Sequence, residues 1–311
     1  MSTLERCLAC PVCRGSLSER RCLPCGNDYA GQSKVPNFVA RQMYASATDY
    51  ENARRVIDFW GNGWAKRLGE SEHSFLYDLD AQALRGHAAK SLAWHKSAQT
   101  LMGVEVPAVG PEGKIALNIG CGSGSESLLL AHMGATCIAM DITSQAAEAA
   151  DKLLSKLDAG FGVQADSRHI PLIDASVDLV YSSGVLHHST DIKRSFCEIH
   201  RVLKPGGVAC IMLYSKWSIM FLQEKLLQWP GEAAWETEGR KNPLTTTHTA
   251  TECRQLLSAF DSVVISKRGG SMRHVAKIGR FLLPSLLDPL VWRSLGPNLN
   301  IVATKAKIAR P

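Results

Sequence analysis

The chain has 311 residues, of which 45% are hydrophobic and 21% are charged, and its formal net charge is +6. This composition is ordinary for a globular protein and excludes a fibrous or wholly disordered chain, while the length allows one large domain with a small module beside it. No apolar run reaches the roughly 18 residues of a membrane helix, and the N-terminus has no signal-peptide stretch. We therefore expect a cytoplasmic protein without a transmembrane segment.

The positive charge is concentrated at the C-terminal end. Residues 266–311 contain nine Lys or Arg and a single acid, Asp288, so this segment carries a net +8 and the remaining residues sum to −2. Such a segment favours an acidic partner or an anionic acceptor, with a solvated basic face as the alternative.

The first 40 residues predict a zinc-binding module. Two C-x2-C pairs, Cys10 with Cys13 and Cys22 with Cys25, present two thiolates each, and four thiolates suit a closed structural Zn²⁺ site. Cys7 offers an alternative pairing with Cys10, and a disordered leader with unligated thiols is a further alternative. A unit of this size has almost no core, so we expect the metal to provide its folding free energy.

Residues 41–112 combine helical patterns rich in Ala, His and aromatic residues, which predicts a helical lead-in to the next domain. Trp60 and Trp64 lie one helical turn apart in this segment. We expect them either to form part of a lid over a ligand or to pack in the core.

Residues 113–311 alternate apolar strands with helical segments, which predicts an α/β domain whose parallel sheet is covered by helices on both faces. The expected strands are 115–119, 136–140, 161–165, 177–181, 208–213, 262–266 and 300–304. The expected helices are 125–133, 144–157 with Thr143 as its cap, 192–203 and 250–259, with helical inserts at about 215–247 and 271–297.

A glycine-rich loop, Leu117-Asn-Ile-Gly120-Cys-Gly122-Ser-Gly124, follows the first of these strands and opens a helix. Its glycines allow a tight turn and a close backbone approach to a ligand, and the helix N-terminus favours a negative group. Asp141 follows 21 residues after Gly120 at the end of the second strand, where an acid can bind two ribose hydroxyls. A nicotinamide-binding loop has the spacing G-x-G-x-x-G, whereas the third glycine here, Gly124, comes one position earlier.

This spacing resembles that of the class I S-adenosylmethionine-dependent methyltransferases. Residues 165–167 (Ala-Asp-Ser) resemble the end of the third strand in that family, residues 174–188 resemble its fourth strand and following loop, and residues 202–207 resemble the turn before its fifth strand. The similarity covers roughly residues 114–267. The segment from Cys10 to Phe38 resembles a bacterial subset in which a zinc ribbon precedes this domain.

The resemblance implies a Rossmann-like, mostly parallel seven-stranded sheet, S-adenosyl-L-methionine as cofactor and Zn²⁺ as a structural metal. It also implies that the glycines approach the methionyl portion, that Asp141 binds the ribose and that Asp166 and Ser167 border the adenine. Many relatives have Asp or Glu at the position of Asn118, whose amide is neutral. The implied cofactor-binding residues are Asn118, Gly120, Cys121, Gly122, Gly124, Asp141, Ile142, Asp166, Ser167 and Ser183.

Three residues are catalytic candidates at the same sheet edge. A general base for an oxygen or nitrogen nucleophile should titrate near neutrality, which favours His. His187 and His188 lie just past the fourth strand, at the carboxyl edge where open α/β sheets bind ligands, and the alternative is that they shape the cofactor pocket. Tyr214 ends the fifth strand, where it either lines the acceptor pocket or packs.

The sequence therefore predicts an S-adenosylmethionine-dependent methyltransferase that acts on an oxygen or nitrogen of a small-molecule acceptor, which is anionic or lipid-linked. The alternative is a methyltransferase that modifies an rRNA base, with the zinc ribbon as its RNA-binding module and the basic C-terminal segment on phosphates. A non-catalytic binding protein of the same fold is a third alternative, motivated by the neutral Asn118.

Overall fold

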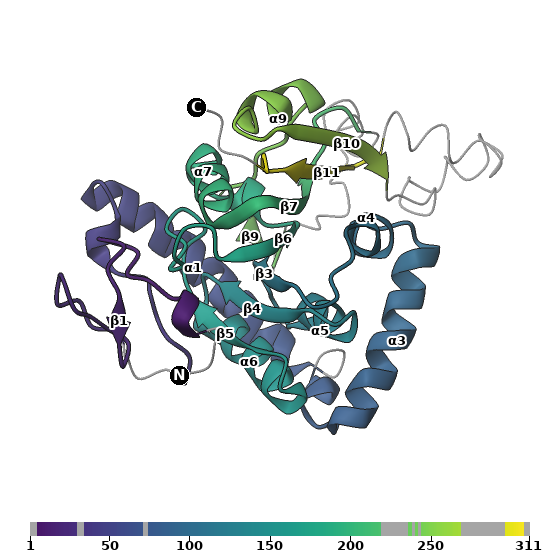
Figure 1. Ribbon diagram of the computed structural model, residues 1–311, viewed down its shortest axis with the longest axis horizontal. Helices are drawn as coiled ribbons and strands as arrows, with labels where there is room; N and C mark the ends of the chain where they lie inside the picture. Colours follow the sequence, from purple (N-terminus) through teal and green to yellow (C-terminus); the bar gives the residue numbers. More distant parts are fainter. Residues whose placement is uncertain are drawn as a thin grey trace.

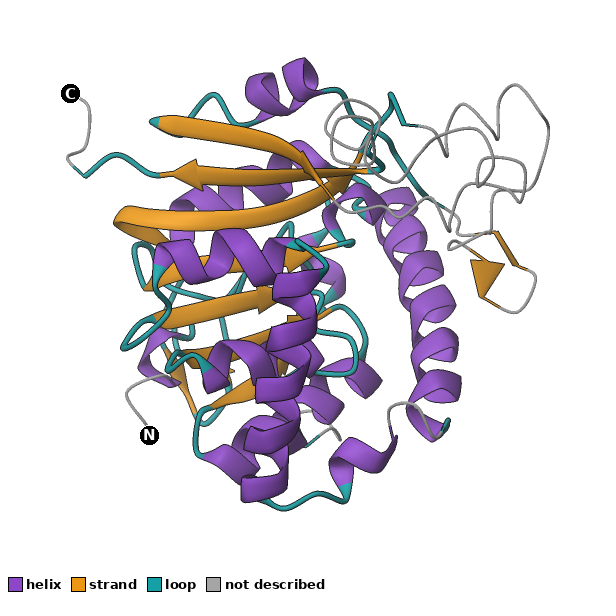
Figure 2. Ribbon diagram, turned by 90° about the vertical axis from the view of Figure 1, so that its right-hand side faces the viewer, coloured by secondary structure: helices purple, strands orange, loops and turns teal. Residues whose placement is uncertain are grey.

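A computed structural model describes residues 5–29, 34–70, 74–218, 236–237, 240–241, 244–268 and 296–307. At its centre is a seven-stranded sheet with helices on both faces (Figure 1 and Figure 2). Strand β11 runs antiparallel to both of its neighbours, and the other neighbouring strands are parallel, which confirms the predicted mostly parallel Rossmann-like sheet. In spatial order the strands are β10 (Ser262–Arg268), β11 (Asn298–Thr304), β7 (Leu203–Tyr214), β6 (Val177–Ser183), β3 (Ile115–Ile119), β4 (Thr136–Asp141) and β5 (Gly160–Gln164).

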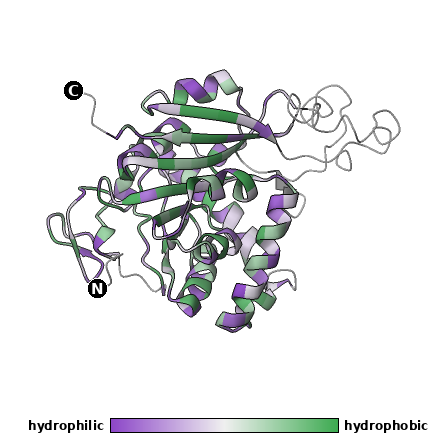
Figure 3. Ribbon diagram, turned by 45° about the vertical axis from the view of Figure 1, so that its right-hand side comes forward, coloured by the Kyte–Doolittle hydropathy of each residue, from purple (hydrophilic) through white to green (hydrophobic). Residues whose placement is uncertain are grey.

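Successive residues of a strand point to opposite sides of the sheet. Because consecutive residues of the central strands are apolar, both faces of the sheet are apolar. In β3, Leu117 joins the core on one face and Ala116 joins the core on the other. Figure 3 shows the central strands as largely hydrophobic. Helices α5 (Ser125–His132) and α6 (Ser144–Leu157) contribute to the core that contains Ala116, whereas α7 (Ile192–Val202) and α9 (Ala250–Leu256) contribute to the one that contains Leu117.

The predicted strands and helices agree with the described ones to within a few residues, except at one strand. Strand β7 begins at Leu203, five residues before the predicted start at 208, so the expected turn at 204–207 lies inside the strand. Val177 pairs with Leu203 and Leu179 pairs with Val208, and the shift of register between these pairs accommodates the extra residues. This pairing depends on the neighbouring strand, which explains why the local sequence predicts a later start.

The described residues of the lead-in segment include the α-helices α1 (Ala47–Gly69), α3 (Ala81–Ser97) and α4 (Leu101–Val109). A polar side chain before each helix accepts a hydrogen bond from a backbone N–H of the first turn, and such a bond fixes where a helix begins. These caps are Ser46, Asp80 and Thr100. Helix α1 packs against α6, and α3 packs against α4 and α5, so the lead-in is part of the same body as the sheet.

The N-terminal segment, with the short hairpin β1 (Leu17–Ser18) and β2 (Arg21–Cys22), lies beside the β5 end of the sheet (Figure 1). The Phe38 N–H donates to the Gln164 carbonyl at 2.8 Å and the Gln164 N–H donates to the Pro36 carbonyl at 2.9 Å, so residues 36–38 run alongside the last residue of β5. Phe38 and Cys22 also share a core with residues of the sheet.

Among the helices that the structure describes, none is long and apolar enough to cross a membrane. The two expected helical inserts fall largely outside the described residues, apart from the paired two-residue strands β8 (Glu236–Thr237) and β9 (Arg240–Lys241). Residues 269–295, which carry much of the C-terminal positive charge, also lie outside them.

Candidate functional site

A cavity of about 620 Å³ lies along the carboxyl ends of five neighbouring strands, β5, β4, β3, β6 and β7. Its volume is in the range of small-molecule and cofactor sites, and the carboxyl ends of parallel strands are where such folds bind ligands. The expected site residues on its lining are Asn118, Gly120, Cys121, Gly122, Asp141, Ile142, Asp166, Ser167, Ser183, His188 and Tyr214.

The glycine loop takes a backbone path that other residues rarely adopt, with φ of +74° at Gly120, +54° at Gly122 and +84° at Gly124. A Cβ on Gly122 would lie 2.6 Å from the Trp64 ring, so the tryptophan packs directly against the backbone at this position and leaves no room for a side chain. A Cβ on Gly124 would instead lie 2.8 Å from the Ala150 Cα, which places Gly124 against α6 and behind the cavity. Gly120 and Gly122 thus belong to the cavity lining, and Gly124 does not.

Asp141 is buried and braces this loop. Its carboxylate accepts hydrogen bonds from the Gly122 N–H at 3.2 Å and from both the N–H and the hydroxyl of Thr143 at 2.9 Å. Burial raises the pKa of Asp141, and these hydrogen bonds oppose that rise. Thr143 is the N-cap residue of α6, but its hydroxyl serves Asp141 and makes no side-chain cap hydrogen bond to the helix, so the expected capping bond is wrong.

A buried ionic network holds the loop after β5. The Arg168 guanidinium donates to the Asp166 carboxylate at 2.9 Å and to Asp49 of α1 at 2.7 Å. The Tyr44 hydroxyl donates to the same Asp166 carboxylate at 3.2 Å. Burial acts to raise the pKa of Asp49, but Arg168 outweighs it and keeps that pKa low. The network ties α1 to the loop that carries Asp166 and Ser167.

The two adjacent histidines occupy different places. His187 is fully buried with its ring centroid 3.7 Å from that of Tyr214, whereas His188 lines the cavity beside Trp60. The His188 Nδ1 lies 2.8 Å from the Leu244 carbonyl oxygen, which only accepts, so Nδ1 carries the proton and Nε2 is the basic nitrogen. Burial lowers the pKa of both rings, which keeps them neutral at pH 7.

Helices α1 and α3 supply the aromatic part of the cavity wall. Trp60 and Trp64 of α1 both line it, with the Arg67 guanidinium 5.4 Å from the Trp64 ring centroid. Trp94 and His95 of α3 line it at the other flank. The structure thus places the two α1 tryptophans at the cavity, next to the glycine loop and His188.

Two features of the cavity were not identified from the sequence. Arg168 contacts Asp49, which lies 119 positions away in the chain, and no local pattern signals such a contact. Glu126 lines the cavity from the first turn of α5, directly after the glycine loop. Glu126 could have been identified from the sequence, because it is an acid in the first turn of the helix that follows the glycine loop.

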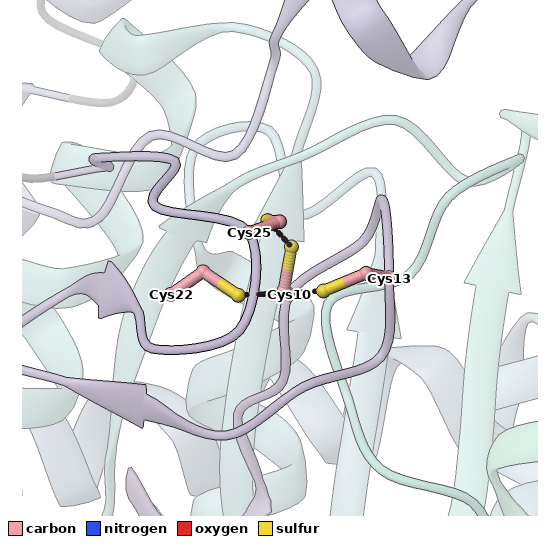
Figure 4. A group of neighbouring side chains, drawn as sticks. All are labelled: Cys10, Cys13, Cys22 and Cys25. Carbon is pink, nitrogen blue, oxygen red and sulfur yellow. Dashed lines mark hydrogen bonds between the residues drawn. The ribbon is translucent and has the colours of Figure 1, made fainter.

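The four cysteines of the two C-x2-C pairs converge in the N-terminal segment, as Figure 4 shows. Their Sγ atoms all lie within 4.8 Å of one another, with Cys10 to Cys25 at 3.6 Å and Cys13 to Cys22 at 3.4 Å. Tetrahedral Zn²⁺ with bonds of about 2.3 Å places thiolates roughly 3.8 Å apart, so the cluster has the dimensions of a zinc site. Among the described residues, this group comprises these four cysteines and does not include Cys7.

Known proteins share the part of the chain that forms this cavity. Residues 117–211 match the family described as "Methyltransferase domain". A malonyl-[acyl-carrier protein] O-methyltransferase of Yersinia pestis is 29% identical over 185 residues, which are 57% of this chain and 65% of that protein. A dimethylglycine N-methyltransferase of Parasynechococcus marenigrum (strain WH8102) is 28% identical over 167 residues, which are 52% of this chain and 55% of that protein. The chain thus spans less than two thirds of the length of these curated relatives.

A solved structure shares the fold. The complex between the Haloferax volcanii Trm112 methyltransferase activator and the putative methyltransferase contains a chain that aligns with a TM-score of 0.51 at 17% identity, over 73% of this chain and 99% of that one. The glycine loop and Asp141 both lie within the matched residues 117–211. Residues 117–211 therefore form a methyltransferase domain of the class I S-adenosylmethionine-dependent type, and the chain also carries an N-terminal four-cysteine cluster consistent with a zinc ribbon.

Proposed function

We propose that this protein transfers a methyl group from S-adenosylmethionine to an oxygen or nitrogen of a small-molecule acceptor. The observation that carries the proposal is the cavity, which runs along the carboxyl ends of five strands and has the glycine loop and Asp141 on its wall. One of the relatives above is named for an O-methyl transfer and the other for an N-methyl transfer, which supports both acceptor atoms.

The cofactor supplies a methyl group that its sulfonium already activates, so the protein's task is to bind, orient and exclude water. The backbone of Gly120 and Gly122 would approach the methionyl portion, Asp141 would hold the ribose hydroxyls, and the Asp166 loop would border the adenine. Trp60 and Trp64 cover the glycine-loop side of the cavity and would keep water from the transferred methyl group.

His188 is the general base in this proposal. Its ring lines the cavity, and the Leu244 carbonyl holds Nδ1 so that Nε2 is available to accept a proton. His187 is buried against Tyr214 and would support the wall rather than react. Tyr214 closes the β7 end of the cavity, where we place the acceptor.

The N-terminal cluster would hold one structural Zn²⁺ through Cys10, Cys13, Cys22 and Cys25. The support is the convergence of the four Sγ atoms at the spacing that tetrahedral zinc needs. Four thiolates leave no open coordination position, so the metal would stabilise this segment and take no part in methyl transfer.

The experiment that tests this function has two stages. The intact protein is titrated with S-adenosylhomocysteine by calorimetry, and one equivalent is expected to bind. Protein and methyl-labelled S-adenosylmethionine are then incubated with cell extract, from which small molecules and RNA are recovered separately. Label in the small-molecule fraction supports the proposal, whereas absence of cofactor binding, or label confined to rRNA, would reject it.

A further inference from the structure

The acids that line the cavity are held in different ways. The Asp141 carboxylate is bonded to Gly122 and Thr143, and the Asp166 carboxylate is paired with Arg168. Glu126, in contrast, forms no salt bridge within the part of the chain that the structure describes, and its own backbone N–H is what stabilises its charge there. Burial raises the pKa of Glu126, because a carboxylate removed from water is costly without an opposing charge.

The position of Glu126 along the cavity shows which part of a ligand it faces. Asp166 follows β5 and Asp141 ends β4, so these acids mark one end. Glu126 begins the helix after β3, and it is close enough to Tyr181 of β6 to raise the pKa of that phenol, although burial is the larger cause. Glu126 therefore lies toward β6, on the opposite side of the glycine loop from Asp166.

The cofactor has a matching distribution of charge. If its adenosine portion lies at Asp141 and Asp166, its amino-acid portion extends past the glycine loop toward β6, and that portion carries an ammonium group. Asn118 cannot supply a counter-charge, because its side chain is a neutral amide that donates to the Ser127 hydroxyl at 2.8 Å. Among the cavity-lining residues that the structure describes, Glu126 is the acid at this end.

We propose that Glu126 binds the ammonium group of the cofactor's methionyl portion and fixes the direction in which that portion lies. This inference rests on the proposed function. The contact would be a charge-assisted hydrogen bond inside a cavity with little water, the setting in which such bonds contribute most. Glu126 would therefore act in binding and orienting the cofactor.

The test compares two ligands and two proteins by titration calorimetry. One ligand is S-adenosylhomocysteine, and the other is its desamino analogue, which keeps the carboxylate and lacks only the ammonium. Wild-type protein should prefer S-adenosylhomocysteine. Glu126→Gln, which keeps the size of the side chain and removes its charge, should weaken binding of S-adenosylhomocysteine by about tenfold or more and leave binding of the desamino analogue unchanged.

Two further variants serve as controls. Glu126→Asp keeps the charge and should restore part of the preference for S-adenosylhomocysteine. Glu112→Gln removes a charge from an exposed residue outside the cavity lining and should bind both ligands as the wild type does. Thermal unfolding of each variant establishes that it is folded.

Three results would overturn the inference in distinguishable ways. If Glu126→Gln keeps the wild-type preference for S-adenosylhomocysteine, Glu126 does not bind the ammonium, and a loss of methyl transfer in that variant would then place the acceptor there. If wild-type protein binds neither ligand, the proposed function itself fails. Equal losses of affinity for both ligands would assign Glu126 a role in shaping the cavity and would also reject the inference.

Discussion

At the scale of single residues, acids that line the cavity also hold the backbone around it in place. Asp141 is the clearest case, because one oxygen holds the Gly122 N–H while the other holds Thr143. A ligand that meets this carboxylate therefore meets a group whose position is already fixed. Such pre-organisation reduces the entropy that binding costs.

Replacing Asp141 should weaken cofactor binding directly. Asp141→Ala removes the ribose hydrogen bonds and the brace on Gly122, and we expect the free energy of S-adenosylhomocysteine binding to become less favourable by about 1.5–3 kcal/mol. Titration calorimetry measures this change. Asp58→Ala, which removes an exposed acid of α1, is the matched control and should have no effect. Unchanged affinity in Asp141→Ala would show that the ribose does not lie at this carboxylate.

The proposed base should leave a signature in the pH dependence of the rate. Burial lowers the pKa of His188 below the ordinary value of about 6.5, so the ring is neutral and able to accept a proton above that pH. The rate of methyl transfer should fall only when the pH drops below about 6.5, as His188 becomes protonated. His188→Gln should lose most of kcat and also this acidic limb. His188 would be excluded as the base if the acidic limb of the wild-type pH–rate profile were centred above pH 6.5. Normal kcat in His188→Gln would exclude it as well.

Residue-level prediction from sequence is strongest where the spacing between residues is local. The glycine loop and Asp141 fall within 22 residues of each other, and both reach the cavity. Arg168 could not be identified in this way, because its partner Asp49 is 119 positions away and the two meet only in the folded chain. His187 and His188 are equivalent in the sequence, and only the packing against Tyr214 and Leu244 distinguishes them.

At the scale of secondary-structure elements, α1 forms part of the cavity wall and is held to the loop after β5 by a salt bridge. The salt bridge between Arg168 and Asp49 joins the first turn of α1 to the loop after β5, and Trp60 and Trp64 follow farther along the same helix. This arrangement makes α1 part of the cavity wall. The strands were predictable because buried strands read as short apolar runs, whereas the early start of β7 depends on its pairing with β6.

Breaking the tie to α1 should speed release of the cofactor. Asp49→Asn keeps the size of the side chain but removes its charge, while Arg168 remains paired with Asp166. The Asp49 side chain is 28% exposed, so we expect a loss of about 1 kcal/mol or less, which corresponds to a dissociation rate up to roughly fivefold higher. Stopped-flow tryptophan fluorescence with S-adenosylhomocysteine measures that rate. An unchanged dissociation rate would show that this salt bridge does not hold the wall.

At the scale of the whole molecule, the cysteine-rich segment is joined to the cofactor domain through several contacts. The Ala9 N–H donates to the Pro171 carbonyl, the Ile173 N–H donates to the Cys7 carbonyl, and Arg14 forms a salt bridge with Glu198 at 2.7 Å. The first two contacts reach the chain just after the Asp166 loop, and the third reaches α7. The C-x2-C spacing predicts the four-cysteine cluster, but the sequence carries no comparable signal for where that cluster packs.

Loss of the metal should therefore weaken binding of the ligand in the cavity. Cys13→Ser removes one thiolate of the cluster and should lose bound zinc, destabilise the N-terminal segment and weaken S-adenosylhomocysteine binding severalfold. Metal analysis and titration of the same preparation measure both effects. Cys197→Ser, which changes an exposed cysteine of α7 outside the cluster, should retain metal and affinity. Stoichiometric zinc in Cys13→Ser would reject the proposed ligand set.

The central claim is that the cavity along the ends of β5, β4, β3, β6 and β7 binds S-adenosylmethionine. A crystal structure of the intact protein with S-adenosylhomocysteine tests it most directly. The account predicts density for the ligand in this cavity, with the ribose at Asp141, the adenine beside Asp166 and the ammonium at Glu126. Ligand density in another place, or in the reverse direction along the cavity, would contradict it.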